Sequence, residues 1–166
     1  MLTYHPAFDS YHCIFRVLLL LDKLENQSFD VDLIKILDFY LCMPPALSKF
    51  KYSSTLSKNK RWGKSFENSN NSSDNYRLLF YEVSRIQDAV FFYLASIGFV
   101  DGKQLKNGQL RLEDSLDLSN FISERMDSVN QELLDFLTSE LAPFPLLGKG
   151  GLKDRSSLMD HRYDIS

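Results

Sequence analysis

The sequence predicts a mainly α-helical chain with one small β-hairpin. Apolar residues recur at three- and four-residue steps over residues 76–97, which is the period of a long amphipathic helix. Segments 103–106 and 109–112 then alternate apolar and polar side chains around Asn107-Gly108, the strongest short-range hairpin signal. A long helix followed by a tight hairpin is typical of a winged helix, so the hairpin is interpreted as a wing. A merely structural β-ribbon is the alternative.

Nine apolar side chains define the stripe of the long helix, and Gly98 follows where a left-handed residue would end it. Because helical neighbours three and four apart share a face, these residues are expected to face the core. They are Tyr76, Leu79, Phe80, Val83, Ile86, Val90, Tyr93, Leu94 and Ile97.

Length and composition bound the organisation. A chain of 166 residues is one domain, or one domain with an appendage. We expect a winged-helix-like domain over 1–113 with a polar basic loop at 46–75, a C-terminal amphipathic helix over 114–142 and a flexible tail over 143–166. The 44% hydrophobic content supports a real core, and a net charge of −3 argues against a general polyanion binder.

Two further helices are predicted, over residues 11–25 and 31–41. Apolar residues cover most of the circumference of the first helix, which therefore lies centrally or at an interface. Only Arg16, Asp22 and Lys23 are left to face water. The second helix ends before Pro44 and carries Asp38 in an apolar turn. Asp38 is predicted to be solvated or locally paired, with a partner contact as the alternative.

Residues 46–75 change character, with six basic residues and no acid between positions 49 and 64. One interpretation is a loop that touches phosphates, with Trp62 available to stack. The other is a solvated loop whose Trp62 packs back on the domain, and the sequence does not choose between them. The candidate nucleic-acid contacts here and in the predicted wing are Lys58, Lys60, Arg61, Lys64, Lys103 and Lys106.

A final helix is predicted over residues 120–141. Its apolar residues follow four-three steps, the narrow seam of a coiled-coil-like contact. Eight acids and one base lie between residues 113 and 140, a surface that would repel DNA. Packing on the same chain is the default for this helix. Still, at least one of the first and last helices is expected to meet another chain, through the candidate partner-binding residues Val129, Glu132, Leu133, Asp135, Phe136 and Glu140.

Chemistry-bearing motifs are missing from the sequence. Cys13 and Cys42 lie in apolar helical patterns and are predicted to be reduced core residues. His5, Asp9 and His12 lack a third strong ligand pattern, so no metal site is predicted. No phosphate loop, nucleophile motif or dinucleotide turn is present. We therefore expect no catalysis and no cofactor. Lacking a basic leader and a long apolar run, the chain is expected to be cytoplasmic, without membrane contact.

Three stretches carry a resemblance to a known family: residues 4–16, residues 31–44, and the Gly98-Phe99-Val100 step. Together they resemble the small middle component of ABC-three-component systems, the group that includes Lamassu-type anti-phage defence. The resemblance covers most of residues 4–112, and its motifs are short and mostly structural. The Ser/Asn-rich stretch at 65–75 has no counterpart in it.

The resemblance implies a non-catalytic subunit. Such proteins accompany an SMC-like ABC ATPase and an effector that is often a nuclease, so DNA would be met mainly through the complex. The small subunit would dock on the ATPase and help to hold or release the effector. The competing hypothesis is a winged-helix transcription regulator, against which stand the acidic balance and the sparse charges of residues 76–97.

Overall fold

The computed structural model describes residues 5–25, 27–66 and 75–160, without the side chains of residues 57–59 and 66. The chain is mostly helical, as predicted, with a small two-stranded antiparallel sheet. In order, its elements are η1 Pro6–Phe8, α1 Ser10–Lys23, β1 Phe29–Asp30, α2 Val31–Cys42, η2 Pro44–Lys49, η3 Ser54–Lys60, α3 Arg61–Phe66, α4 Tyr76–Ser96, α5 Gly102–Lys106, β2 Gln109–Leu110, α6 Ser119–Ser123, η4 Met126–Ser128, α7 Gln131–Phe136, η5 Leu137–Leu141 and α8 Leu152–Ser156.

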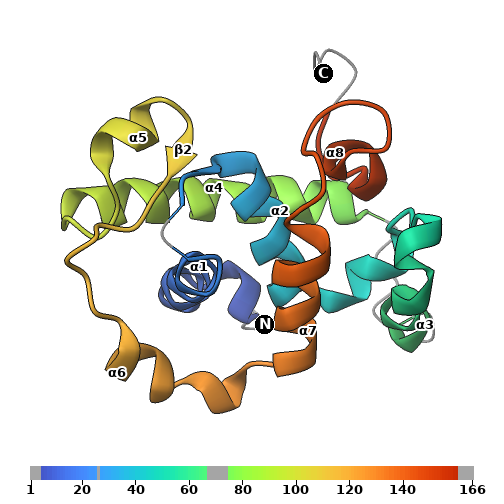
Figure 1. Ribbon diagram of the computed structural model, residues 1–166, viewed down its shortest axis with the longest axis horizontal. Helices are drawn as coiled ribbons and strands as arrows, with labels where there is room; N and C mark the ends of the chain where they lie inside the picture. The colour runs from blue at the N-terminus through green and yellow to red at the C-terminus, as the bar shows by residue number, and fades with distance from the viewer. Residues whose placement is uncertain (1–4, 26, 67–74, 161–166) are drawn as a thin grey trace, which may run out of the picture.

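Helix α1 lies at the centre of the molecule. It packs against both α2 and α4, and the segment from α6 to α7 passes along its other side (Figure 1). Phe15 meets Phe121 of that segment edge to face, with ring centroids 6.0 Å apart. All residues from Phe15 to Leu21 are buried. The predicted central position is therefore confirmed, and this chain itself covers the faces of α1 that seemed to need a partner.

Side-chain caps set where the main helices begin. Asp9 accepts from the backbone N–H groups of Tyr11 and His12 at the start of α1, at 2.8 and 3.1 Å. Asn75 accepts from the N–H of Leu78 at 3.1 Å at the start of α4. These oxygens satisfy donors that have no partner within their own helix. At the other end of α4, Gly98 adopts the predicted left-handed conformation, with φ +78°.

The predicted hairpin over residues 103–112 is wrong in detail. Residues 102–106 form the short helix α5, because Asp101 caps the N–H groups of Lys103 and Gln104. Strand β2 pairs instead with β1, and Val100 forms an isolated bridge with Leu112. The arrangement is compatible with a winged helix. Strand β1 lies between α1 and α2, β2 follows the long helix α4, and α5 lies where the wing would be.

The segment predicted as a polar loop is largely helical. Elements η2, η3 and α3 occupy most of residues 44–66. Trp62 is buried and stacks on Phe136, with ring centroids 6.1 Å apart and planes inclined by 26°. The interpretation in which Trp62 packs back on the domain is therefore the one observed. Residues 67–74, which hold most of the Ser/Asn-rich stretch, lie outside the described residues.

The single helix predicted over residues 120–141 is broken into four short elements. Val129 is extended, and the side chain of Asn130 caps α7 by accepting from Leu133 at 3.1 Å. Asparagine competes for backbone hydrogen bonds and favours caps over helix interiors. The break disrupts the seam, because its residues no longer lie along one straight helix.

The prediction of a flexible tail from residue 143 does not hold up to residue 160. Leu152 and Leu158 are buried, and the N–H of Leu152 donates to the carbonyl of Pro145 at 2.8 Å. Helix α8 also forms an ion pair with α2, between Lys153 Nζ and Asp32 Oδ2 at 3.0 Å. Pro and Gly residues mark the turns of this segment, but its scattered apolar residues reach the core.

Candidate partner-binding surface

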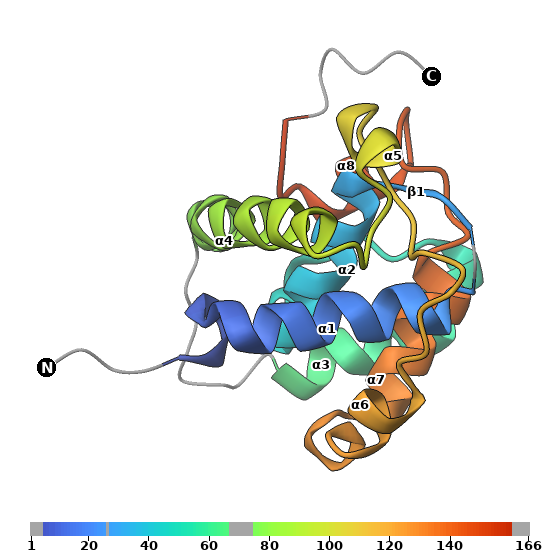
Figure 2. The ribbon, with the colours of Figure 1, turned by 90° about the vertical axis from the view of Figure 1, so that its left-hand side faces the viewer.

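The long helix α4 has two unlike faces. One is buried and comprises Tyr76, Phe80, Val83, Gln87, Val90, Phe91 and Leu94. The other carries the α4 apolar face, defined by Leu78, Tyr81, Phe92 and Tyr93, whose exposed fractions are 51%, 64%, 69% and 51%. At 100° per residue these four side chains fall within an arc of about 120°. Helix α4 lies at the edge of the molecule (Figure 2). Its outer surface is thus aromatic where a solvated helix would be polar.

Charges on this outer surface are few. Arg85 and Glu82 lie between the two ends of the α4 apolar face, and both are exposed. Among the described residues, neither forms a hydrogen bond or an ion pair. Asp88, by contrast, binds Lys35 of α2, with Nζ and Oδ1 2.7 Å apart. The face is therefore an apolar strip with one cation, Arg85, and one anion, Glu82, within it.

A buried polar triad sits on the opposite side of α4. Arg16 of α1 donates to Asp38 of α2 from two nitrogens, Nε at 2.6 Å and Nη2 at 3.3 Å. Gln87 of α4 donates from Nε2 to the same carboxylate at 2.7 Å and to the Lys35 carbonyl at 3.1 Å. Asp38 and Gln87 are fully buried and Arg16 nearly so. The triad joins the three largest helices at one point.

The triad corrects one prediction and sharpens another. Arg16 does not face water; burial acts to lower its pKa, but the Asp38 carboxylate acts against this and the net pKa is raised. Asp38 is locally paired, as one of the predicted alternatives had it. The amide of Gln87 is oriented with Nε2 toward the carboxylate, because the reverse would set two oxygens against each other. Gln87 Oε1 has no hydrogen-bond partner among the described residues.

A groove of about 480 Å³ opens beside the triad. It lies between the start of α1, the end of α2 and the break before α7, and its lining includes Arg16, Cys42 and Val129. Burial raises the pKa of the Cys42 thiol to about 12, and burial likewise raises the pKa of Cys13. Both thiols are free and protonated near neutral pH, which suits core residues and not nucleophiles.

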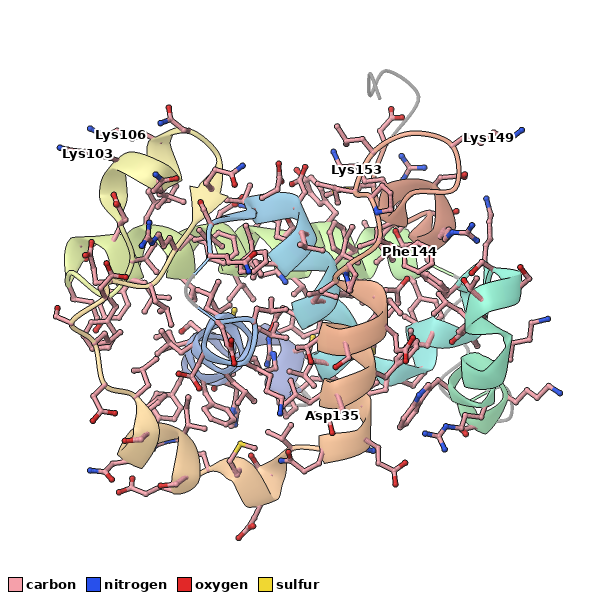
Figure 3. All side chains as sticks on the ribbon, in the orientation of Figure 1. Lys103, Lys106, Asp135, Phe144, Lys149 and Lys153 are labelled. Carbon is pink, nitrogen blue, oxygen red and sulfur yellow. The ribbon has the colours of Figure 1, made fainter. Side chains whose placement is uncertain are left out.

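The candidate nucleic-acid residues fall into two separate groups. Lys60, Arg61 and Lys64 are exposed on η3 and α3, whereas Lys103 and Lys106 project from α5 at the opposite end of the molecule (Figure 3). Arg61 already contacts Glu132 at 3.5 Å and lies over the ring of Trp62. The side chain of Lys58 lies outside the described residues. The structure thus does not bring the two groups together.

The candidate partner residues of the last segment also separate. Leu133 and Phe136 are buried in this chain's own core, and Val129 lines the groove. Glu132, Asp135 and Glu140 are exposed, and Asp135 contacts Lys23 at 3.3 Å. Figure 3 shows Asp135 on α7. The carboxylates of this segment are therefore accessible to a partner, whereas Leu133 and Phe136 of its apolar seam are not.

Sequence reasoning missed the α4 apolar face and the role of Gln87. The stripe was assigned to one side of the helix, yet Tyr93 and Ile97 of that stripe are exposed. Leu78, Tyr81 and Phe92 lay off the stripe, and three bulky apolar residues on the predicted polar side were the available signal. Gln87 lay within the apolar positions, where a lone polar residue indicates a buried hydrogen bond.

Other chemistry is not found in the part of the chain that the structure describes. Its His, Cys, Asp and Glu side chains form no cluster of three that could hold a metal ion. None of its helices combines the length and the apolar character needed to cross a membrane.

Comparison with known proteins decides the family. The sequence profile of the ABC-three component (ABC-3C) system Middle Component 5 family matches residues 2–164. The chain belongs to this family. No curated protein and no solved structure matches it. An ABC-3C middle component works in a system of several components, so surfaces for partners are the features to expect on this chain.

Proposed function

We propose that this chain is a non-catalytic accessory subunit that docks on an SMC-like ABC ATPase. In that role it helps to hold or regulate an effector, such as a nuclease, in anti-phage or anti-plasmid defence of the Lamassu type. The α4 apolar face is the observation that carries the proposal, and membership of the ABC-3C middle components supports it. The complex is proposed to be cytoplasmic.

Aromatic residues on an exposed helix favour a protein partner. Tyr and Phe supply large contact areas at low cost in side-chain entropy, and they are enriched in the buried centres of interfaces. Phe92 and Tyr81 are the most exposed large apolar residues of the described chain. Burying them against another protein would remove from water the apolar surface that this chain leaves open. The partner surface is proposed to be apolar, with a carboxylate placed to meet Arg85.

The same helix argues against a free DNA-binding regulator. In a DNA-binding winged helix, the helix before the wing enters the major groove and needs polar and basic side chains. The outer face of α4 carries Tyr81 and Phe92 instead, with Glu82 beside Arg85. The acids of residues 113–140 would add repulsion. DNA contact is therefore proposed to occur mainly through the complex.

Co-expression with the SMC-like ABC ATPase of the same three-component system tests the proposal. We expect the two proteins to co-elute from size-exclusion chromatography with a constant mass ratio by light scattering. The purified chain alone should turn over neither ATP nor DNA. A well-folded monomer that never co-purifies with that ATPase would overturn the subunit hypothesis and favour the regulator.

A further inference from the structure

A pocket of about 340 Å³ is lined by residues of η2, of the start of α4 and of the end of α8. Its polar lining consists of Lys49, Arg77, Ser156 and Ser157 beside Tyr76. The pocket lies apart from the α4 apolar face, and the proposed docking does not involve it. Two cations and two hydroxyl groups converge on one concave site.

The two cations have no counter-charge within the described chain. Neither Lys49 nor Arg77 forms an ion pair or a side-chain hydrogen bond with any described residue, and no described carboxylate lines the pocket. The nearby Asp154 instead binds Lys51 and the N–H of Gly150. Unpaired positive charges in a concave site raise the local concentration of anions.

Of the two helix ends at the pocket, the start of α4 suits an anion. Asn75 satisfies the N–H groups of Leu78 and Leu79, and no acceptor for the N–H of Arg77 occurs among the described residues. That end of the 21-residue α4 carries the positive end of its dipole. The end of α8 carries the negative end of its helix dipole. Its last carbonyls, however, already accept hydrogen bonds from Ser157 and from the N–H of Lys51.

Behind the pocket lies the fully buried side chain of Tyr40, whose pKa burial raises and a hydrogen bond with the Ser156 side chain lowers. Ser156 Oγ accepts from the N–H of Leu158 and donates to the Lys153 carbonyl, each at 3.4 Å. Because both of these bonds are long, an oxyanion in the pocket could take the Ser156 proton while Ser156 Oγ accepts from Tyr40.

We propose that this pocket binds a phosphate group. Lys49 and Arg77 neutralise its charge, and the Ser156 hydroxyl donates to one of its oxygens. The phosphate belongs either to a small phosphorylated ligand or to a nucleic-acid strand that continues over the basic residues of η3 and α3. Both sources present the same oxyanion to the same three side chains.

An NMR titration of the intact chain with inorganic phosphate tests the proposal, against sodium chloride at matched ionic strength. The amide signals of Arg77 and Ser157 should shift with phosphate and not with chloride. Arg77→Ser and Lys49→Ser should each weaken binding by about tenfold, because each removes a charged hydrogen bond. Arg111→Ser is the matched control, since it removes the same charge at a residue that does not line the pocket, and it should bind phosphate as the parent chain does.

Two further ligands identify the source of the phosphate. If adenosine monophosphate and a single-stranded oligonucleotide bind equally well, and Lys60→Ser/Lys64→Ser affects neither, the ligand is a small phosphorylated molecule. If the oligonucleotide binds more tightly and this double variant removes the difference, the source is a nucleic-acid backbone. Shifts that persist unchanged in Arg77→Ser, or no shift with phosphate, overturn the proposal. These results do not depend on whether the ATPase co-purifies.

Discussion

Helix α4 carries a polar side chain where it meets the core and aromatic side chains where it meets water. Gln87 is fully buried in the triad with Arg16 and Asp38, whereas Phe92 is 69% exposed on the opposite face. The polar group inside is matched by partners from α1 and α2. The aromatic groups outside have no matching surface in the described chain. Toward its own domain, the polar group of this helix is paired. Toward solvent, its aromatic residues remain uncovered by the described chain.

Replacing Asp38 with Ala should break the inner side of this comparison and give the largest effect. It would leave Arg16 buried without a counter-charge, which costs about 3–5 kcal/mol of the free energy of unfolding. Urea denaturation measures the loss. The triple variant Arg16→Met/Asp38→Leu/Gln87→Leu should recover most of it, because it removes the charges together. A loss below about 1 kcal/mol in Asp38→Ala would show that the triad does not hold the helices.

Replacing Gln87 with Leu tests the part that α4 plays in the triad. Asp38 would lose one donor but keep both bonds from Arg16. We expect a loss of about 1–2 kcal/mol in the free energy of unfolding, smaller than for Asp38→Ala. Removal of the unpartnered Oε1 offsets part of the cost. A loss equal to that of Asp38→Ala would mean that Gln87, not Arg16, is the main partner of the carboxylate.

The two thiols test how strongly burial suppresses cysteine ionisation on the inner side, where Cys13 is buried and Cys42 lines the groove. Burial raises the pKa of Cys42 from 9.0 to about 12, so at pH 8 its thiolate fraction is far smaller than in the unfolded chain. Ellman's reagent should react roughly a hundredfold more slowly with the folded protein than in urea. The pKa of Cys42 is higher in the folded than in the unfolded chain, so the neutral thiol favours the folded state. This contribution of Cys42 to the free energy of unfolding is present below pH 9 and is lost as the pH rises toward 12. Equal reaction rates in the folded and unfolded states would contradict the raised pKa values of the thiols.

Phe91 and Phe92 provide a matched pair for the outer side. Phe92→Ser should change the free energy of unfolding by no more than about 0.5 kcal/mol, because the ring is exposed. Phe91→Ala, one residue earlier and only 2% exposed, should cost about 3–5 kcal/mol. Thermal and urea denaturation measure both. A large loss in Phe92→Ser would show that its ring already has a packing role within the chain.

Local patterns predicted most helices, while tertiary packing decided the rest. Helix α2 ends before Pro44 and α4 ends at Gly98, both as the residues predict. The hairpin predicted around Asn107-Gly108 is wrong for two reasons. The cap at Asp101 makes the residues before the turn helical, and β2 pairs with β1 instead of with those residues. Residues 29–30 and 109–110 are far apart in the sequence, and local patterns do not show that they will pair as strands.

The candidate site was harder to predict than the fold. The sequence offers two separate sets of candidate nucleic-acid contacts, near Trp62 and in the predicted wing, and the structure places them at opposite ends of the molecule (Figure 3). The pocket at Lys49 and Arg77 joins three elements far apart in the chain, including a segment predicted to be loose. Such a site depends on tertiary contacts, which spacing along the sequence does not encode.

Binding of the ATPase to Tyr81→Lys/Phe92→Lys tests most directly whether the α4 apolar face is the docking surface. We predict an affinity loss of about a hundredfold or more with unchanged stability, since central aromatic anchors carry most of an interface's energy. Leu147→Lys, a change at another exposed apolar residue, is the control and should bind normally. Reversing Glu132, Asp135 and Glu140 to Lys should mainly slow association. An unchanged affinity for the ATPase in Tyr81→Lys/Phe92→Lys would contradict the account.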